Sequence, residues 1–237
     1  MYKAVIFDMD GTILDTISDL TDSINYALKE IGEKHNLSED MVKLCFGCGI
    51  RADMEKSLAL ARGCPGEDLE FVGNSIPLFS YHFNEEDVKR LESLFNPYYS
   101  SHCRIHTGPY EGIINVLKTL KAHGICTAVA SNKNEKDVKL LAENLFPHLF
   151  DEVIGNGPEL PRKPAPHMIH RILEELSLSP EESVYVGDSE VDIETAKNAG
   201  IPCISVSWGF RTVPFLKAHG ASFIVHDRGE LLASLMK

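Results

Sequence analysis

Two aspartates near the start of the chain have the spacing of a paired-carboxylate site. Asp8 and Asp10 follow a short apolar run, residues 4–7, that is typical of a buried β-strand. Side chains two positions apart in extended backbone point to the same side, so the two carboxylates would face one space. Gly11 allows a sharp turn after them, and Thr12 adds a hydroxyl group. Close carboxylates need a cation or a shared proton, although D-x-D-G also occurs in solvated turns.

Two other segments offer donors that suit a phosphate group. Ser131 and Asn132 follow a predicted strand over residues 125–130, and their hydroxyl and amide groups can donate hydrogen bonds to phosphate oxygens. Lys163 lies among prolines in residues 161–166, where stiff backbone fixes the origin of its ammonium group. Taken singly, the first segment also fits a helix N-cap, and the second fits a solvated loop.

A second pair of aspartates follows a later strand. Asp188 comes just after a predicted strand over residues 183–186, and Asp192 lies four positions further on. Mg²⁺ prefers oxygen ligands and usually takes one or two carboxylates with water and phosphate oxygens. Asp8, Asp188 and one carbonyl group could supply that set, although the segment by itself also fits a strand that ends at a helix N-cap.

Alternating strands and helices must position these residues. We predict strands over residues 4–7, 125–130, 152–154, 183–186, 202–206 and 222–225, and helices over residues 112–122, 135–144, 166–176, 192–199, 213–219 and 229–236. This alternation predicts an α/β fold, a parallel sheet with helices on both faces. Ligands of such sheets bind beyond the carboxyl ends of the strands, so all four segments are expected in one crevice.

A long segment after the first strand has helical patterns only. Beyond a helix over residues 16–31, we predict helices over residues 41–46, 52–61, 68–80 and 85–99. Two domains are therefore expected. Residues 1–15 and 103–237 would form the core, and residues 16–102 would form an inserted helical domain.

The order of the four polar segments resembles that of the haloacid dehalogenase superfamily. D-x-D-G-T, S-N, K-P-x-P and G-D-S-x-x-D follow one another over the whole chain, each after a predicted strand. The resemblance implies a Rossmann-like core with a mobile helical cap of type C1. It also implies a Mg²⁺-dependent phosphatase that works through an aspartyl-phosphate intermediate.

The same resemblance implies roles for individual residues. Asp8 would attack phosphorus, Asp10 would protonate the leaving group and then activate water, and Lys163 would face Asp8 and the phosphoryl group. The catalytic residues would thus be Asp8, Asp10 and Lys163. The implied metal-binding residues are Asp8, Asp10, Asp188 and Asp192. The implied phosphate-binding residues are Gly11, Thr12, Ser131, Asn132 and Lys163.

Several segments further resemble the phosphoglycolate phosphatase branch of the superfamily. They are residues 47–49, 58–59, 109–112, 192–200 and 206–211. This branch implies 2-phosphoglycolate, a small phosphorylated metabolite, as the substrate. Arg51 is expected in a loop between two cap helices, where it either binds the anionic end of the substrate or is solvated.

Other activities on the same scaffold stay open as alternatives. They are a sugar phosphomutase of the β-phosphoglucomutase type, a pyrophosphatase and a nucleotidase. The mutases usually have a glutamate directly before the metal-binding aspartate, whereas this chain has Gly187 before Asp188, as the phosphatases do.

The composition predicts a globular protein without a nucleic-acid or membrane partner. The 237 residues are 43% hydrophobic and 24% charged, with a net charge of -12 and no run rich in Lys or Arg. No apolar stretch is long enough to span a membrane, and the first apolar run is too short for a secretory signal. We therefore expect a cytoplasmic protein, a monomer by default with a dimer as the alternative.

The six cysteines are expected to be reduced and without a function. Cys45 and Cys48 form a C-x-x-C pattern, but no second pair of ligands completes a zinc site. The histidines 102, 106 and 148 also lack the spacing of a metal site, and we expect them on the surface or in loops.

Overall fold

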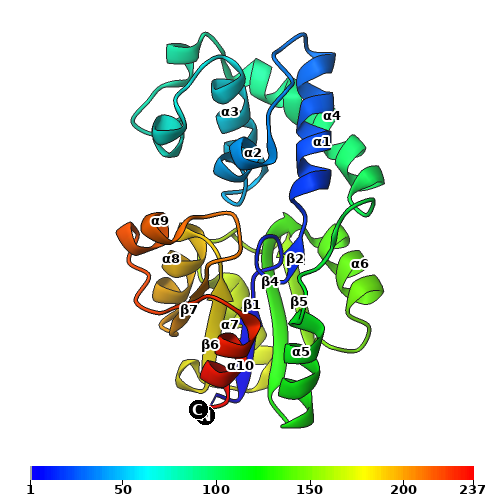
Figure 1. Ribbon diagram of the computed structural model, residues 1–237, viewed down its shortest axis with the longest axis vertical. Helices are drawn as coiled ribbons and strands as arrows, with labels where there is room; N and C mark the ends of the chain where they lie inside the picture. Colours follow the sequence, from blue (N-terminus) through cyan, green and yellow to red (C-terminus); the bar gives the residue numbers. More distant parts are fainter. Residues whose placement is uncertain (1) are drawn as a thin grey trace. The chain divides into compact units, whose positions relative to one another are not determined.

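The computed structural model describes residues 2–237, which form two compact units (Figure 1). One unit contains the residues up to Asp15 together with Gly108–Lys237, and the other contains Thr16–Thr107. The second boundary thus follows Thr107, not residue 102 as expected. Its cause is Asp19, whose two carboxyl oxygens accept hydrogen bonds from the backbone N–H groups of His106 and Thr107, both at 2.9 Å.

The first unit is built on a six-stranded sheet in which every neighbouring pair is parallel. Its order is β5-β4-β1-β6-β7-β8. The strands are β1 (Ala4–Phe7), β4 (Cys126–Asn134), β5 (Glu152–Asn156), β6 (Ser183–Gly187), β7 (Cys203–Val206) and β8 (Ile224–Val225). A separate antiparallel pair, β2 (Leu14–Asp15) and β3 (Gly108–Pro109), forms where the chain leaves and re-enters this unit. The predicted parallel α/β sheet is confirmed.

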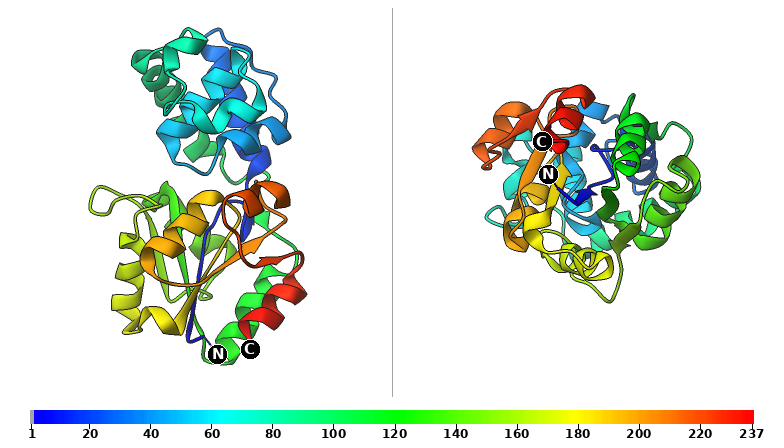
Figure 2. Two further views of the ribbon diagram at one scale, coloured as in Figure 1. Left: turned by 90° about the vertical axis from the view of Figure 1, so that its left-hand side faces the viewer. Right: turned by 90° about the horizontal axis from the view of Figure 1, so that it is seen from below.

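Successive strand residues build a core on each face of the sheet. Val5 and Phe7 pack with one set of helices, whereas Ile6 packs with the other. The first set is α5 (Ile113–Ala122), α6 (Glu135–Leu145) and α10 (Arg228–Leu235), and the second is α7 (His167–Leu176) and α8 (Glu190–Ala199). Helices α5 and α10 lie side by side (Figure 2). The short helix α9 (Val213–Ala218) follows β7. Because both faces are covered, the central strand β1 is apolar and buried throughout.

The second unit is helical. It contains α1 (Ile17–Glu30), α2 (Glu39–Cys45), α3 (Ile50–Ala61) and α4 (Glu85–His102). The helix predicted over residues 68–80 is wrong, because this stretch holds parts of two 3₁₀ segments, η1 (Gly66–Phe71) and η2 (Leu78–Tyr81). Gly73 has a φ of 80° and Pro77 lacks an N–H group, so neither can continue a helix. Among residues 2–237, no helix has the length and apolar character needed to cross a bilayer.

The contact between Asp19 and the end of the helical unit should stabilise the fold. Asp19 is 2% exposed, and replacing it with alanine leaves two partly buried backbone N–H groups without their acceptor. We expect Asp19→Ala to lower the free energy of unfolding by about 2–4 kcal/mol in urea denaturation followed by helical circular dichroism.

The matched control is Asp22→Ala on the same helix. Its carboxylate is exposed and lies 3.9 Å from the His106 ring, so the expected loss is below about 0.5 kcal/mol. Equal losses in the two variants would contradict the assignment to Asp19.

Candidate active site

A buried lysine links three segments that are far apart in the sequence. Asp8 lies at the carboxyl end of β1, and its N–H donates to the carbonyl of Val186 in the neighbouring strand β6 at 2.9 Å. The Nζ of Lys163 donates to Asp8 Oδ1 at 2.7 Å and to Asp192 Oδ1 at 2.8 Å. The lysine side chain is only 2% exposed. Two of the aspartates predicted to share one site therefore meet at the ammonium group of Lys163.

Two side chains fix the position of Lys163. Asn132 Nδ2 donates to the Lys163 carbonyl at 3.1 Å, and Asn132 Oδ1 accepts from the Lys163 N–H at 2.8 Å. The Tyr185 hydroxyl accepts from Lys163 Nζ at 2.9 Å and donates to the carbonyl of Ala130 at 3.0 Å. In the structure Asn132 thus orients the lysine backbone, and Tyr185, to which the sequence assigned no role, orients its ammonium group.

The loop after β1 is held against Asp188. Thr12 Oγ1 donates to Asp188 Oδ1 at 2.8 Å, and the Phe210 N–H donates to Asp188 Oδ2 at 2.7 Å. Gly11 has a φ of 81°, and a Cβ there would lie 2.5 Å from Asp188 Oδ2, so only glycine permits this approach. Trp208 Nε1 donates to the Thr12 carbonyl at 3.0 Å and gives the same loop a further hydrogen bond.

Asp192 has donors on both carboxyl oxygens. Oδ1 accepts from Lys163, while Oδ2 accepts from the Ser189 hydroxyl at 2.6 Å and from the N–H groups of Ser189 and Asp188 at 3.1 and 3.2 Å. The Ser189 hydroxyl in turn caps α8 by accepting from the Asp192 N–H. Asp192 therefore links the start of α8 to Lys163.

The cluster contains more negative than positive charge. Oxygens of Asp8, Asp188 and Asp192 lie within 4.8 Å of one another, and Lys163 is the ammonium that contacts two of them. Burial raises the pKa of Asp8 well above its ordinary value in spite of Lys163, and the other two carboxylates raise it further. Burial and Asp192 raise the pKa of Asp188 to about 7. The group could hold a cation, and its all-oxygen donors suit a hard ion such as Mg²⁺.

Lys163 itself stays charged in this environment. Burial alone would lower its pKa, but the carboxylates of Asp192 and Asp8 raise that pKa well above its ordinary value. An ammonium between two carboxylates is a fixed positive charge at the carboxyl end of the sheet, which suits the binding of a phosphoryl group.

A second lysine, which the sequence analysis gave no role, contacts Asp10. Strand β4 continues past Ala130 to Asn134 with a shift of register, so Ser131 and Lys133 belong to the strand. Lys133 Nζ forms an ion pair with Asp10 Oδ1 at 3.0 Å, and its N–H donates to Ser131 Oγ at 3.2 Å. The sequence signal that could have identified Lys133 is its position directly after Ser131 and Asn132 at the end of a predicted strand.

Arg51 is the one predicted site residue outside this network. It belongs to the helical unit, where it lies in the first turn of α3 and not in the loop expected before that helix. Its Nε lies 3.0 Å from Glu55 Oε1, and its Nη2 contacts Glu85. These two carboxylates set its orientation within that unit. Its role in substrate binding stays a prediction.

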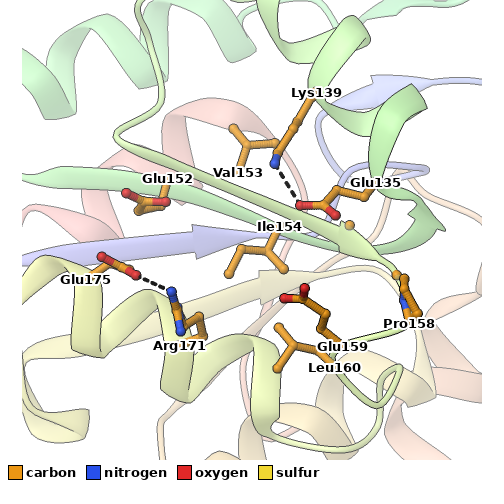
Figure 3. A pocket seen from close by; sticks show the side chains of 12 residues that line it. Glu135, Lys139, Glu152, Val153, Ile154, Pro158, Glu159, Leu160, Arg171 and Glu175 are labelled. Atoms are coloured by element: carbon orange, nitrogen blue, oxygen red, sulfur yellow. Dashed lines mark ion pairs between the residues drawn. The ribbon is translucent and has the colours of Figure 1, made fainter.

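A cavity in the first unit lies along the edge strand β5, between α6 and α7 (Figure 3). It has a volume of about 420 Å³, and its lining contains none of the predicted site residues. Its two cations are each paired one helical turn away on their own helix, Lys139 with Glu135 and Arg171 with Glu175, both at 2.7 Å. The cavity is therefore separate from the aspartate cluster.

Comparisons with known proteins agree with this geometry. Residues 5–206 match the family model for haloacid dehalogenase-like hydrolases. The phosphoglycolate phosphatases of Pasteurella multocida and Aquifex aeolicus are each 30% identical, over 99% and 88% of this chain and 98% and 86% of their own lengths. A crystal structure from Lactobacillus delbrueckii subsp. bulgaricus, provisionally assigned as a phosphoglycolate phosphatase, is 42% identical. It superposes with a TM-score of 0.95 and covers 99% of this chain and 98% of its own.

The family match covers most of the chain, and these similarities extend over nearly all of it. The chain belongs to the haloacid dehalogenase-like hydrolase family, within its phosphoglycolate phosphatase-like branch, and is a phosphatase that acts on phosphoric monoesters.

Proposed function

We propose that this phosphatase hydrolyses 2-phosphoglycolate to glycolate and phosphate, with Mg²⁺ as cofactor and Asp8 as nucleophile. The observation that carries the proposal is the Asp8 carboxyl group, which is buried at a strand end and bonded through Oδ1 to Lys163. That bond fixes the orientation of the carboxylate and leaves Oδ2 to attack phosphorus. The new Asp8–phosphorus bond forms as the bond from phosphorus to the ester oxygen breaks.

Asp10 carries the proton transfers of the proposed reaction. It gives a proton to the departing alkoxide and later takes one from the water that attacks the phosphorylated Asp8. That second attack breaks the bond between phosphorus and Asp8 and releases phosphate. Asp10 lies in the loop that follows Asp8, and the ion pair with Lys133 fixes the orientation of its side chain. Ser131 donates a hydrogen bond to a phosphoryl oxygen, and Lys163, whose three N–H groups bind Asp8, Tyr185 and Asp192, attracts the phosphoryl group by its charge.

Mg²⁺ would be held by Asp8 and Asp188, with the backbone carbonyl of Asp10 as a further oxygen ligand. Each oxygen of Asp188 accepts one of the hydrogen bonds described above, whereas Asp192 Oδ2 alone accepts three and Oδ1 accepts from Lys163. We therefore assign Asp192 the orientation of Lys163 and of the turn at Asp188. When bound, the ion offsets the negative charge that builds up as the carboxylate meets the phosphate. The excess of carboxylates over ammonium groups in the cluster supports a divalent cation.

One observation favours 2-phosphoglycolate as the substrate, and a second argues against a mutase. The curated relatives that cover nearly the whole chain are named phosphoglycolate phosphatases. In addition, a Cβ at Gly187 would lie 2.3 Å from Asp192 Cβ, so the glutamate typical of the mutases does not fit at this position.

The proposal is tested by measuring phosphate release from a panel of phosphoesters with Mg²⁺ and then with EDTA. The panel contains 2-phosphoglycolate, sugar phosphates, nucleoside monophosphates and pyrophosphate. We expect Mg²⁺-dependent release with the highest kcat/KM for 2-phosphoglycolate. A higher kcat/KM for another phosphoester would overturn the substrate, and transfer of phosphate between sugar positions without net release would indicate a mutase.

Substitution of the two motif aspartates separates their roles. Asp8→Asn removes the nucleophile and should lower kcat at least about 10³-fold without a loss of thermal stability. Asp10→Asn removes the proton carrier and should also lower kcat strongly, while Mg²⁺ binding followed by calorimetry is kept. Near-normal turnover by the first variant, or loss of metal binding by the second, contradicts these roles.

Because the pKa of Asp188 is raised, the stabilisation of the protein by Mg²⁺ should depend on pH. A carboxyl group with a pKa of about 7 in the folded protein, against an ordinary value of 3.8, favours folding fully at low pH and loses this contribution as the pH rises through about 7. Protons and Mg²⁺ compete for Asp188, so the gain in Tm on adding Mg²⁺ should be larger at about pH 8 than at about pH 5.5.

Asp188→Asn is the control for this experiment. It should abolish most of the gain in Tm at both pH values. A gain of the same size at both pH values in the unmodified protein would contradict the role of Asp188.

A further inference from the structure

One cysteine of the helical unit has a buried lysine as its neighbour. Cys48 lies in the turn between α2 and α3, between Gly47 and Gly49, which both have positive φ. Its side chain is partly exposed, and its N–H donates to Asp53 Oδ1 at 3.1 Å. The turn is thereby fixed to the first turn of α3, and the thiol has a defined position.

The ammonium group of Lys56 points at this thiol. Lys56 lies on α3 and is 6% exposed, and its Nζ donates to Cys48 Sγ at 3.1 Å. Within residues 2–237, no carboxylate forms an ion pair with it. A buried ammonium without an anion is costly, and a thiolate at Cys48 would supply that anion.

The other cysteines are buried or have a raised pKa. Cys45, Cys64 and Cys103 are buried. Burial raises the pKa of the partly exposed Cys126, and it raises the pKa of Cys203 to about 12. A thiol with a raised pKa forms little thiolate at neutral pH and reacts slowly. The six cysteines therefore differ in their chemistry although none is in a disulfide.

We propose that Cys48 is a modification site, where Lys56 stabilises a thiolate that reacts with peroxides and soft carbon electrophiles. With hydrogen peroxide, the sulfur attacks one oxygen, the O–O bond breaks, and Cys48 becomes a sulfenic acid while the other oxygen leaves as hydroxide and takes up a proton to form water. The sulfur loses two electrons and the peroxide gains them. This site lies outside the aspartate cluster and does not depend on the proposed substrate.

The test is competitive labelling of the full-length protein at neutral pH with less than one equivalent of iodoacetamide, followed by peptide mass spectrometry. We expect Cys48 to react at least about tenfold faster than Cys126 or Cys203. A parallel sample with hydrogen peroxide and dimedone should carry the dimedone adduct at Cys48. Labelling of Cys126 or Cys203 at the same rate as Cys48 would overturn the proposal.

Two substitutions test whether Lys56 is the cause. Lys56→Met keeps the length of the side chain without its charge and should lower the rate at Cys48 about tenfold, whereas Lys56→Arg keeps the charge and should retain most of the rate. An unchanged rate in Lys56→Met contradicts the proposal. If Lys56→Met does not fold, the proposal is judged from the relative labelling rates of the cysteines in the native protein and in Lys56→Arg. Cys48 must then react fastest in both.

Discussion

The arrangement of the first unit depends on one buried ammonium group. Lys163 contacts Asp8 from β1 and Asp192 from α8, and both carboxylates lie in a core where isolated charges are unfavourable. Without the lysine, neither carboxylate would form an ion pair with a side chain of the cluster. The bonds from Asn132 to the lysine backbone and from its ammonium group to Tyr185 therefore support the whole site, because they keep this charge in place.

Close packing of backbone against carboxylates is the second constraint. A Cβ at Gly187 would lie 2.3 Å from Asp192 Cβ, and a Cβ at Gly209 would lie 2.3 Å from Asp188 Cβ. Glycine at these positions lets peptide groups surround the acids, so that N–H groups rather than water orient them. The cluster is thus rigid as well as charged, and positioning of this kind dominates phosphoryl transfer.

Much of the core could be predicted from the sequence, because its signals are local. A strand followed by an acid or a hydroxyl residue can be recognised within ten positions, and parallel strands bring their carboxyl ends to one edge. The contacts that escaped prediction join residues far apart or depend on strand register. Lys133 meets Asp10 because β4 continues through a register shift, and Tyr185 has the pattern of an ordinary strand residue.

The same limit explains one of the errors in the helical unit. The boundary after Thr107 follows from hydrogen bonds to Asp19, 88 positions earlier, and no local pattern contains that information. The helix over residues 68–80 was predicted from apolar spacing, yet Gly73 lies against the Glu55 carboxylate, where a Cβ would be 2.4 Å from Oε2. Tertiary packing and the local signals of Gly73 and Pro77 both oppose a helix there, and the apolar spacing was given too much weight.

The charge of the cluster also explains how an acidic protein could act on an anionic ester. With a net charge of -12, the chain as a whole repels phosphate, so attraction must be local. Burial raises the pKa of Asp8, so a site without a metal ion disfavours the charged form of this carboxyl group, which is the nucleophilic form. On the proposed mechanism, burial makes Asp8 a poor nucleophile when no metal ion is bound. The same burial makes its carboxylate a strong ligand for a metal ion. The excess of carboxylates over ammonium groups around Lys163 would then bind the metal ion. That ion would both keep Asp8 charged and attract the phosphate group of the substrate.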